Sequence, residues 1–135
     1  MLETIHEYAL ERLEEHGQVE ALRQRHAAYY LALAKEAAPH LWQSEQGVQG
    51  VWLARLELEH NNLRAALAWS RTAASAAETG LHLVAALWPF WLVHGHLREG
   101  RAWLAELLAL TAQSSASSAA RAGALMGLAS LNARL

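Results

Sequence analysis

The side chains that could carry out acid–base or metal chemistry in this sequence are histidine, glutamate and serine. The 135 residues include 8 histidines and 13 acidic residues, all of them glutamate, and no cysteine. Thiolate chemistry and disulfides are therefore excluded. The sequence also lacks the G-x-x-x-x-G-K-[ST] phosphate loop, the G-x-S-x-G elbow and the H-E-x-x-H motif. We predict a non-enzymatic chain with no catalytic residue and no cofactor.

Two Glu-x-x-His pairs have the spacing that di-iron helical bundles use. They are Glu3 with His6 and Glu57 with His60. Such bundles also require a glutamate from each of two further helices. In the second predicted helix, 19–38, no glutamate lies at the centre of the inward stripe. About one pair of this spacing arises by chance in a chain this rich in glutamate and histidine. We therefore predict no metal site.

Three other histidines have simpler explanations. His94 and His96 flank Gly95 at the expected end of a helix, where a positively charged imidazole is favoured by the helix dipole. A metal-binding or pH-sensing role is the alternative. His26, on the inward face of its helix, is expected to be a hydrogen-bonded core residue.

The segment 52–69, "WLARLELEHNNLRAALAW", places two asparagines in the middle of a helical pattern. On a helical wheel its apolar residues form two stripes that keep their phase through the asparagines, which predicts one helix buried on two faces. The two stripes are Trp52, Leu56, Leu63, Ala66 and Leu67, and Val51, Leu58, Asn62 and Trp69. We expect Asn61 to point outward. We expect Glu59 and Asn62 to form a structural joint, with the Asn62 amide bonded to the backbone of a neighbouring connection.

The composition predicts an all-α fold. Hydrophobic residues make up 53% of the chain, and only 2 residues are proline. Alanine and leucine, which favour helix, supply much of that apolar content. The predicted helices are 2–15 (ended by Gly17), 19–38 (ended by Pro39), 51–73, 81–94 (with a kink or first turn at Pro89), 97–110 and one from about 119. Their inward residues are Leu2, Ile5, Ala9 and Leu13; Leu22, His26, Tyr29, Leu33 and Ala37; and, in the last helix, Leu125, Leu128 and Ala129. Segments 43–50 and 73–80 are expected connectors, and the serine-rich loop 111–118 is expected to cap the last helix.

The charge and hydropathy of the sequence argue against nucleic-acid binding, a membrane span and secretion. The net charge of −2 is not that of a nucleic-acid-binding surface, which is normally basic. The most apolar run, 81–93, is too short to cross a bilayer. No secretory signal opens the chain. We expect a cytoplasmic chain with no direct contact to nucleic acid or membrane.

Helices 81–94 and 97–110 predict a helical hairpin around Gly95. The spacing of their inward residues is similar to the tetratricopeptide repeat pattern. These residues are Val84, Leu87, Trp88, Trp91, Gly100, Leu104 and Leu107. Trp88 stands where that pattern usually has a small residue. Antiparallel hairpins that begin a tetratricopeptide-like α-solenoid are therefore the predicted architecture, with an ordinary helical bundle as the alternative.

Tryptophan is abundant in this chain, with 6 residues. Trp88 and Trp91 are expected to fill the core. Trp42 and Trp103 are possible interface residues, because exposed aromatic side chains often anchor partners.

Four stretches resemble, in the same order, a region of large bacterial signal-transducing ATPases. The stretches are "MLETIHEYALERLEEHG" (1–17), "LRQRHAAYYLALA" (22–34), "WLARLELEHNNLRAALAW" (52–69) and "ALWPFWLVHGHLREGRAWLAELLAL" (86–110). The proteins are transcriptional regulators of the LuxR and antibiotic-regulator types, with an NB-ARC-like (STAND) ATPase and a tetratricopeptide-like sensor. The similar region follows the ATPase module. Met1 matches an internal position of that pattern, which suggests a fragment or a truncated reading frame. Two residues depart from the family pattern. Pro89 stands where the helix usually continues in the family, and Asn61 stands where the family commonly has Asp.

The resemblance implies a layout and a role. Residues 1–17 would close a winged-helix-like module, 18–73 would connect, and 81–135 would begin the repeats. The implied function is a non-catalytic linker and sensor scaffold that docks the ATPase module, further repeats, or a protein or small-molecule effector. The alternatives are a self-contained bundle that binds a small molecule or metal, and a fragment without a function of its own.

Overall fold

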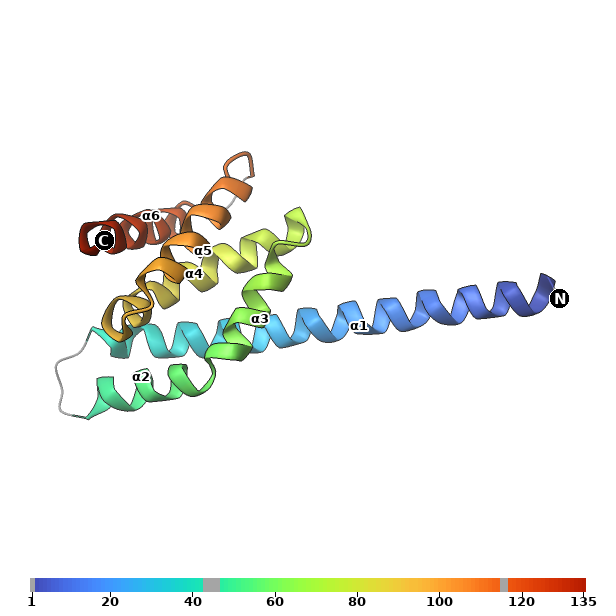
Figure 1. Cartoon of the computed structure of the whole chain (residues 1–135), viewed down its shortest axis with the longest axis horizontal. Helices are drawn as coiled ribbons and strands as arrows, with labels where there is room; N and C mark the ends of the chain where they lie inside the picture. Colours follow the sequence, from blue (N-terminus) through green and yellow to red (C-terminus); the bar gives the residue numbers. More distant parts are fainter. Residues whose placement is uncertain (1, 43–46, 115–116) are drawn as a thin grey trace.

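The computed structural model describes residues 2–42, 47–114 and 117–135, with side chains from residue 7, and every regular element in these ranges is helical. The elements are α1 (Leu2–Ala37), the 3-10 helix η1 (Ala38–Leu41), α2 (Val48–Leu58), α3 (His60–Ser70), α4 (Ala74–His94), α5 (Leu97–Leu110) and α6 (Ser118–Arg134). The predicted all-α class is confirmed. Helix α4 is central, because it contacts α1, α3, α5 and α6 (Figure 1).

Helix α1 is a single helix of 36 residues, so the predicted helix end at Gly17 is wrong. Gly95, which ends α4, adopts the left-handed conformation typical of a helix end, whereas Gly17 does not. A glycine inside a helix costs only about 1 kcal/mol relative to alanine, which strong helix formers on both sides can offset. Figure 1 shows the N-terminal half of α1 extending away from the other helices. Residues 7–19 are all exposed, so the inward positions predicted at Ala9 and Leu13 are wrong, and those at Leu2 and Ile5 lie outside the described side chains.

The C-terminal half of α1 contacts α3 and α4. Its buried face carries small residues, with Ala27, Ala34 and Ala37 at 0%, 1% and 0% exposure. Small side chains let helices approach closely, so the alanine face is the one that packs. The prediction for this helix is correct in part: Leu33 and Ala37 are buried, at 7% and 0% exposure, whereas Leu22 and Tyr29 are 62% and 58% exposed.

The predicted single helix over 51–73 is wrong, because it is divided between α2 and α3 at Glu59. Glu59 has φ −93° and ψ 8°, outside helical values. The first predicted stripe is largely buried, including Leu56, Leu63 and Leu67. The second is not, since Val51 and Leu58 are 68% and 83% exposed. Only one face is therefore buried, and a change of direction at Glu59 does not interrupt it.

Helix α4 begins at Ala74, so the connector predicted over 73–80 is largely helix. A Cβ at Gly80 would collide with Ser70, which shows how closely the start of α4 approaches the end of α3. The helix also continues through the buried Pro89, although proline cannot donate the usual backbone hydrogen bond there. By length and composition α4 could cross a membrane, but 67% of its apolar window is buried by the protein itself. A central helix of a folded domain has the same composition, so this observation carries no membrane assignment.

The turn between α4 and α5 is built as predicted. Gly95 has φ 82°, and the backbone N–H of His96 donates to the carbonyl oxygen of Trp91 at 3.0 Å, which closes a Schellman-type helix end. Helix α5 has its predicted bounds, and Gly100, Leu104 and Leu107 are buried as expected; Leu108 is buried as well.

Helix α6 packs against both α4 and α5. The Ser117 side chain accepts a hydrogen bond from the Ala120 N–H, which confirms the predicted cap. The predicted inward face is wrong at two of its three residues: Leu125 is 52% exposed and Ala129 is also exposed, whereas Leu128 is half-buried and packs against the core. The face that is buried carries small residues and one leucine. Its members are Ala120, Ala124, Gly127 and Leu131.

The small residues of α6 are required by the tryptophans of α4. A Cβ at Gly127 would lie 2.6 Å from Trp88 Cδ1, and a Cβ at Gly100 would lie 2.8 Å from Trp91 Cε3. Leucines at the α6 contact would therefore overlap the indole ring. This explains why α6 turns its larger residues to solvent.

The predicted division into 1–17, 18–73 and 81–135 stays a prediction. Its first boundary falls inside α1, whereas residue 73 lies between α3 and α4.

We expect Gly127→Ala to lower the free energy of unfolding by about 1–3 kcal/mol, because overpacking outweighs the gain in helix propensity. Urea denaturation monitored by circular dichroism measures this. Gly50→Ala is the matched control, since Gly50 lies in α2 and an added Cβ meets nothing within 4 Å. A stability for Gly127→Ala equal to or above that of Gly50→Ala would contradict the packing described.

Candidate functional site

The joint between α2 and α3 is fixed to α1 by the carboxylate of Glu59. One oxygen, Oε2, accepts hydrogen bonds from the Tyr30 hydroxyl at 2.9 Å and from the Asn62 amide at 2.9 Å. The other lies 3.9 Å from Arg55 Nε. The hydrogen bonds from Asn62 and then Tyr30 hold the pKa of Glu59 below its usual value. Burial, and next the bond to Glu59, raise the pKa of Tyr30.

Of the two predicted joint residues, Glu59 lies at the joint and Asn62 does not bond as predicted. Glu59 is the residue at which the two helices divide, and it contacts α1 through Tyr30. Asn62 is exposed, and its amide binds a side chain three residues earlier rather than the backbone of a neighbouring connection. That part of the prediction is wrong, because Asn62 lies on the face of α3 that no other helix covers. Asn61 is exposed as expected.

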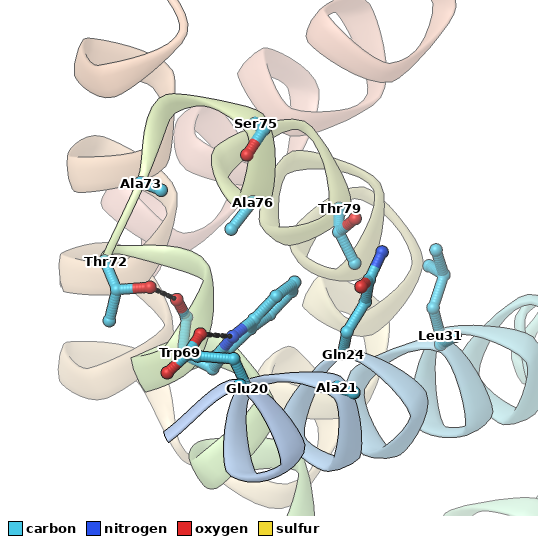
Figure 2. A pocket seen from close by; sticks show the side chains of 12 residues that line it. Glu20, Ala21, Gln24, Leu31, Trp69, Thr72, Ala73, Ser75, Ala76 and Thr79 are labelled. Carbon is cyan, nitrogen blue, oxygen red and sulfur yellow. Dashed lines mark hydrogen bonds between the residues drawn. The ribbon is translucent and has the colours of Figure 1, made fainter. Parts of the chain in front are cut away.

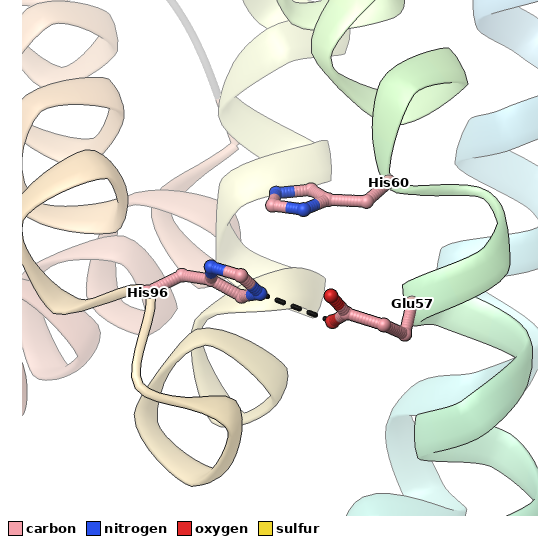
Figure 3. Close-up of side chains that lie close together, drawn as sticks. All are labelled: Glu57, His60 and His96. Atoms are coloured by element: carbon pink, nitrogen blue, oxygen red, sulfur yellow. Dashed lines mark hydrogen bonds and ion pairs between the residues drawn. The ribbon is translucent and has the colours of Figure 1, made fainter.

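A cluster of four polar side chains lies where this joint meets the α4–α5 turn. We call Glu57, His60, His94 and His96 the His–Glu cluster. The carboxylate oxygen Glu57 Oε2 is 3.1 Å from His94 Nδ1 and 3.0 Å from His96 Nε2. The imidazole rings of His60 and His96 lie 4.3 Å apart between centroids. Figure 3 shows Glu57, His60 and His96 pointing toward one another from three segments of the chain.

Local structure explains how these residues meet. Glu57 is in the last turn of α2 and His60 begins α3, so the division at Glu59 sets their relative orientation. His94 ends α4, and the left-handed Gly95 turns the chain so that His96 lies beside it. The ring of Phe90, fully buried on α4, lies 5.7 Å from the His60 ring and 5.6 Å from the His96 ring.

The electrostatics of the cluster favour an ionised carboxylate and a neutral buried imidazole. The hydrogen bond with His96 is the largest cause that lowers the pKa of Glu57. Burial, followed by the charge of Arg64, lowers the pKa of His60. His60 is 7% exposed, and its Nε2 atom has no hydrogen-bond partner. The nearest carboxylate oxygen recorded for it, Glu99 Oε1, is 3.8 Å away.

Glu99 is held by Arg64 in a two-pronged ion pair between α3 and α5. Arg64 Nε and Nη2 donate to Glu99 Oε1 and Oε2, each at 2.6 Å. These bonds are the main cause that lowers the pKa of Glu99 and raises that of Arg64. Glu99 is therefore committed to Arg64 and is not available as a strong partner for His60.

The two candidate interface tryptophans have different surroundings. Trp42 is 62% exposed, and its ring meets the buried Trp88 ring edge-on at 5.1 Å between centroids. Trp103 is half-buried, with the Arg71 guanidinium 4.8 Å from its ring centroid and its N–H donated to Glu99 at 3.4 Å. Trp42 is thus open to a partner, whereas Trp103 is largely engaged within the chain. An interface role for either residue stays a prediction.

Two grooves flank Trp69, where α1 crosses α3. The first, seen in Figure 2, lies between α1 and the start of α4, and the Trp69 indole N–H donates to Glu20 Oε2 at 3.4 Å on its wall. The second is apolar, and we call it the α1–α3 groove. Its apolar lining consists of Val19, Leu22, Tyr29, Ala65, Ala68 and Trp69.

Sequence reasoning missed both the α1–α3 groove and the His–Glu cluster. It assigned Leu22 and Tyr29 to the core, although the alanines opposite them were the alternative packing face. The sequence analysis considered Glu57 with His60 and His94 with His96 as two separate pairs. The predicted hairpin could have connected the two pairs, because it places His96 beside the preceding helices. The other pair, Glu3 and His6, lies outside the described side chains.

The chain is similar in sequence to proteins named as transcriptional regulators. It is 40% identical over 108 residues to a "Putative HTH-type transcriptional regulator" of Mycobacterium bovis and to a protein of the same name in Mycobacterium tuberculosis. The matched region covers 80% of this chain and 12% of each relative, so the chain spans only a small part of their length. No protein-family model and no solved structure matches the chain. The relationship is therefore to transcriptional regulators in general.

We expect Tyr30→Phe to lower the melting temperature by about 2–5 °C, because it removes the hydrogen bond that fixes the α2–α3 joint to α1. Thermal denaturation measures the shift. Tyr29→Phe is the control, since the Tyr29 hydroxyl is on an exposed residue. Equal melting temperatures for the two variants would show that the Glu59 contact does not hold the joint.

The Arg64–Glu99 pair should contribute a coupling energy of about 1 kcal/mol in a double-mutant cycle with alanine, because both of its hydrogen bonds are charge-assisted. Arg71, the residue directly after α3, also pairs with Glu106 of α5, but through a single 3.4 Å contact between side chains that are 44% and 41% exposed. We expect less than about 0.5 kcal/mol for it. A coupling at Arg64–Glu99 no larger than at Arg71–Glu106 would contradict the assigned geometry.

Proposed function

We propose that this chain is a non-catalytic helical scaffold of a larger transcriptional regulator, in which it packs against neighbouring modules and docks a protein or small-molecule effector. The observation that carries the proposal is the 40% identity over 108 residues to two proteins named as transcriptional regulators. The match covers only 12% of each relative, so the corresponding segment is a small part of a regulator whose other regions contribute to its function. We further propose the regulator class that the sequence motifs resemble, a signal-transducing ATPase with tetratricopeptide-like repeats.

The exposed apolar face of α1 supports a packing role. Val19, Leu22 and Tyr29 lie within about 80° of one another on a helical wheel, and all are exposed, at 42%, 62% and 58%. A contiguous apolar surface of this kind usually marks an interface. The α1–α3 groove continues this face onto α3, which gives a concave seat for a helix or loop of another module.

The arrangement of the last three helices supports the repeat assignment. Helix α6 contacts both α4 and α5, and α4 also contacts α5. In helical repeat arrays, the first helix of each unit packs on both helices of the unit before it. Helix α6 would then open a second unit, with α4 and α5 as the first.

The proposed division of labour leaves DNA recognition and nucleotide hydrolysis to other modules. The net charge of −2 and the lack of a phosphate-loop motif in the given sequence support this division. A cytoplasmic location follows from the proposed role in transcription.

Photo-crosslinking in the native host tests the packing role. With benzoylphenylalanine in place of Leu22, we expect crosslinks to peptides from an ATPase or DNA-binding module of a regulator, identified by mass spectrometry. Lys35, exposed on a different side of the same helix, is the control position and should give several-fold fewer crosslinks. Equal crosslinking at both positions, or crosslinks to copies of this chain alone, would contradict the proposal.

A further inference from the structure

The His–Glu cluster has the donor set of a metal site. Glu57, His60 and His96 each offer one ligand atom, and these three atoms lie within 4.8 Å of one another. They come from the end of α2, the start of α3 and the α4–α5 turn, as Figure 3 shows. The three converge only because the chain folds, since His96 is 36 residues beyond His60.

The buried His60 supplies a second observation that points to a ligand. Its side chain is more than nine-tenths buried, and Nε2 has no hydrogen-bond partner in the described structure. Leaving a buried polar atom without a partner destabilises the folded state. Such atoms in folded proteins usually mark a bound water, an ion or a functional role. The His60 ring lies 4.3 Å from the His96 ring between centroids, so the unpartnered atom belongs to a ring that packs within the cluster.

We propose that Glu57, His60 and His96 bind a divalent metal ion of the zinc type. Two imidazoles and one carboxylate are ligands that Zn²⁺ prefers, and three protein ligands leave a fourth position for water or a partner's side chain. In a tetrahedral zinc site the ligand atoms lie about 3.4 Å apart. The cluster reaches that spacing by closing its longest distance by at most roughly 1.4 Å. Glu57 is exposed and His96 half-buried, so rotation of their side chains achieves this.

The charged groups at and beside the cluster are the carboxylate of Glu57 and the Arg64–Glu99 ion pair. Glu57 provides one negative charge, and the charge of Glu99 is balanced by Arg64 at 2.6 Å. His94 Nδ1 lies 3.1 Å from the Glu57 carboxylate and orients it, as outer hydrogen-bond partners of metal ligands commonly do. Phe90 closes the inner side of the cluster against the core.

Metal binding would join the α2–α3 joint directly to the α4–α5 turn. At present these segments are linked here by the exposed hydrogen bonds of Glu57 with His94 and His96. A shared ion would fix the angle between the connecting helices and the first predicted repeat. This role goes beyond the proposed scaffold function and does not depend on it.

Calorimetric titration of the purified, EDTA-treated 135-residue chain with ZnCl₂ tests the site. We expect one equivalent to bind and to raise the melting temperature. Glu57→Gln, His60→Gln and His96→Gln should each weaken binding by roughly 10- to 100-fold or more, and His94→Gln by about tenfold. His26→Gln and His82→Gln are matched controls at half-buried histidines outside the cluster, and should bind as the unsubstituted chain does.

The result that overturns the site is either no saturable binding by the unsubstituted chain or unchanged affinity in the three ligand variants. Because His60 is buried, circular dichroism must show that His60→Gln remains folded; if it does not, Glu57→Gln and His96→Gln decide. Substitution with Co²⁺ provides an independent readout. A tetrahedral visible absorption band in the unsubstituted chain, absent in Glu57→Gln and His96→Gln, supports the assignment, and its persistence in those variants contradicts it. Crosslinking at Leu22 needs no metal, so the two proposals can fail separately.

Discussion

The packing of the aromatic segment of α4 against smaller residues on its neighbours is the constraint on which the rest of the structure depends. Trp88 requires a glycine at position 127, and Trp91 requires one at position 100. Phe90 lies against the histidine rings at the α4–α5 turn. These contacts determine how close α5 and α6 approach α4. Interiors as dense as those of proteins tolerate little change in volume, so each large ring fixes the size of the residue opposite it.

Around this core, the polar contacts set the relative positions of the helices. Glu59 connects the α2–α3 joint to α1, and the Arg64–Glu99 pair connects α3 to α5. Each contact is modest in energy, because the side chains are partly exposed. These contacts matter because hydrogen bonds are directional. A hydrogen bond with a defined geometry fixes the angle between two helices, which apolar packing alone leaves adjustable.

The core could be predicted from the sequence only where large apolar residues face a neighbour. The hairpin of α4 and α5 was predicted correctly at Gly95 and along the inward face of α5, because a left-handed glycine and a leucine stripe are strong local signals. The faces of α1 and α6 were predicted only in part, because their buried surfaces consist largely of alanine and, in α6, glycine, with one leucine in each (Leu33 and Leu131). Hydrophobicity favours leucine over alanine, whereas close packing against α4 favours the reverse. The His–Glu cluster was not predicted as a unit, since its members are local to three different segments.

The sequence by itself determined the all-α class, the turn at Gly95, the serine cap of α6 and the absence of cysteine chemistry, because each follows from residue type and local spacing. Only the tertiary structure showed that α1 continues through Gly17, that the helix at residues 51–73 divides at Glu59, and that His60 and His96 meet beside Glu57. At Gly17, which is exposed, the helix formers on both sides are sufficient to continue the helix. At Glu59 and at the cluster the reason is tertiary. Local preferences near a polar residue differ by about 1 kcal/mol, and the contacts that tip such balances come from residues distant in the sequence: Tyr30 for Glu59, and the α4–α5 turn for the cluster.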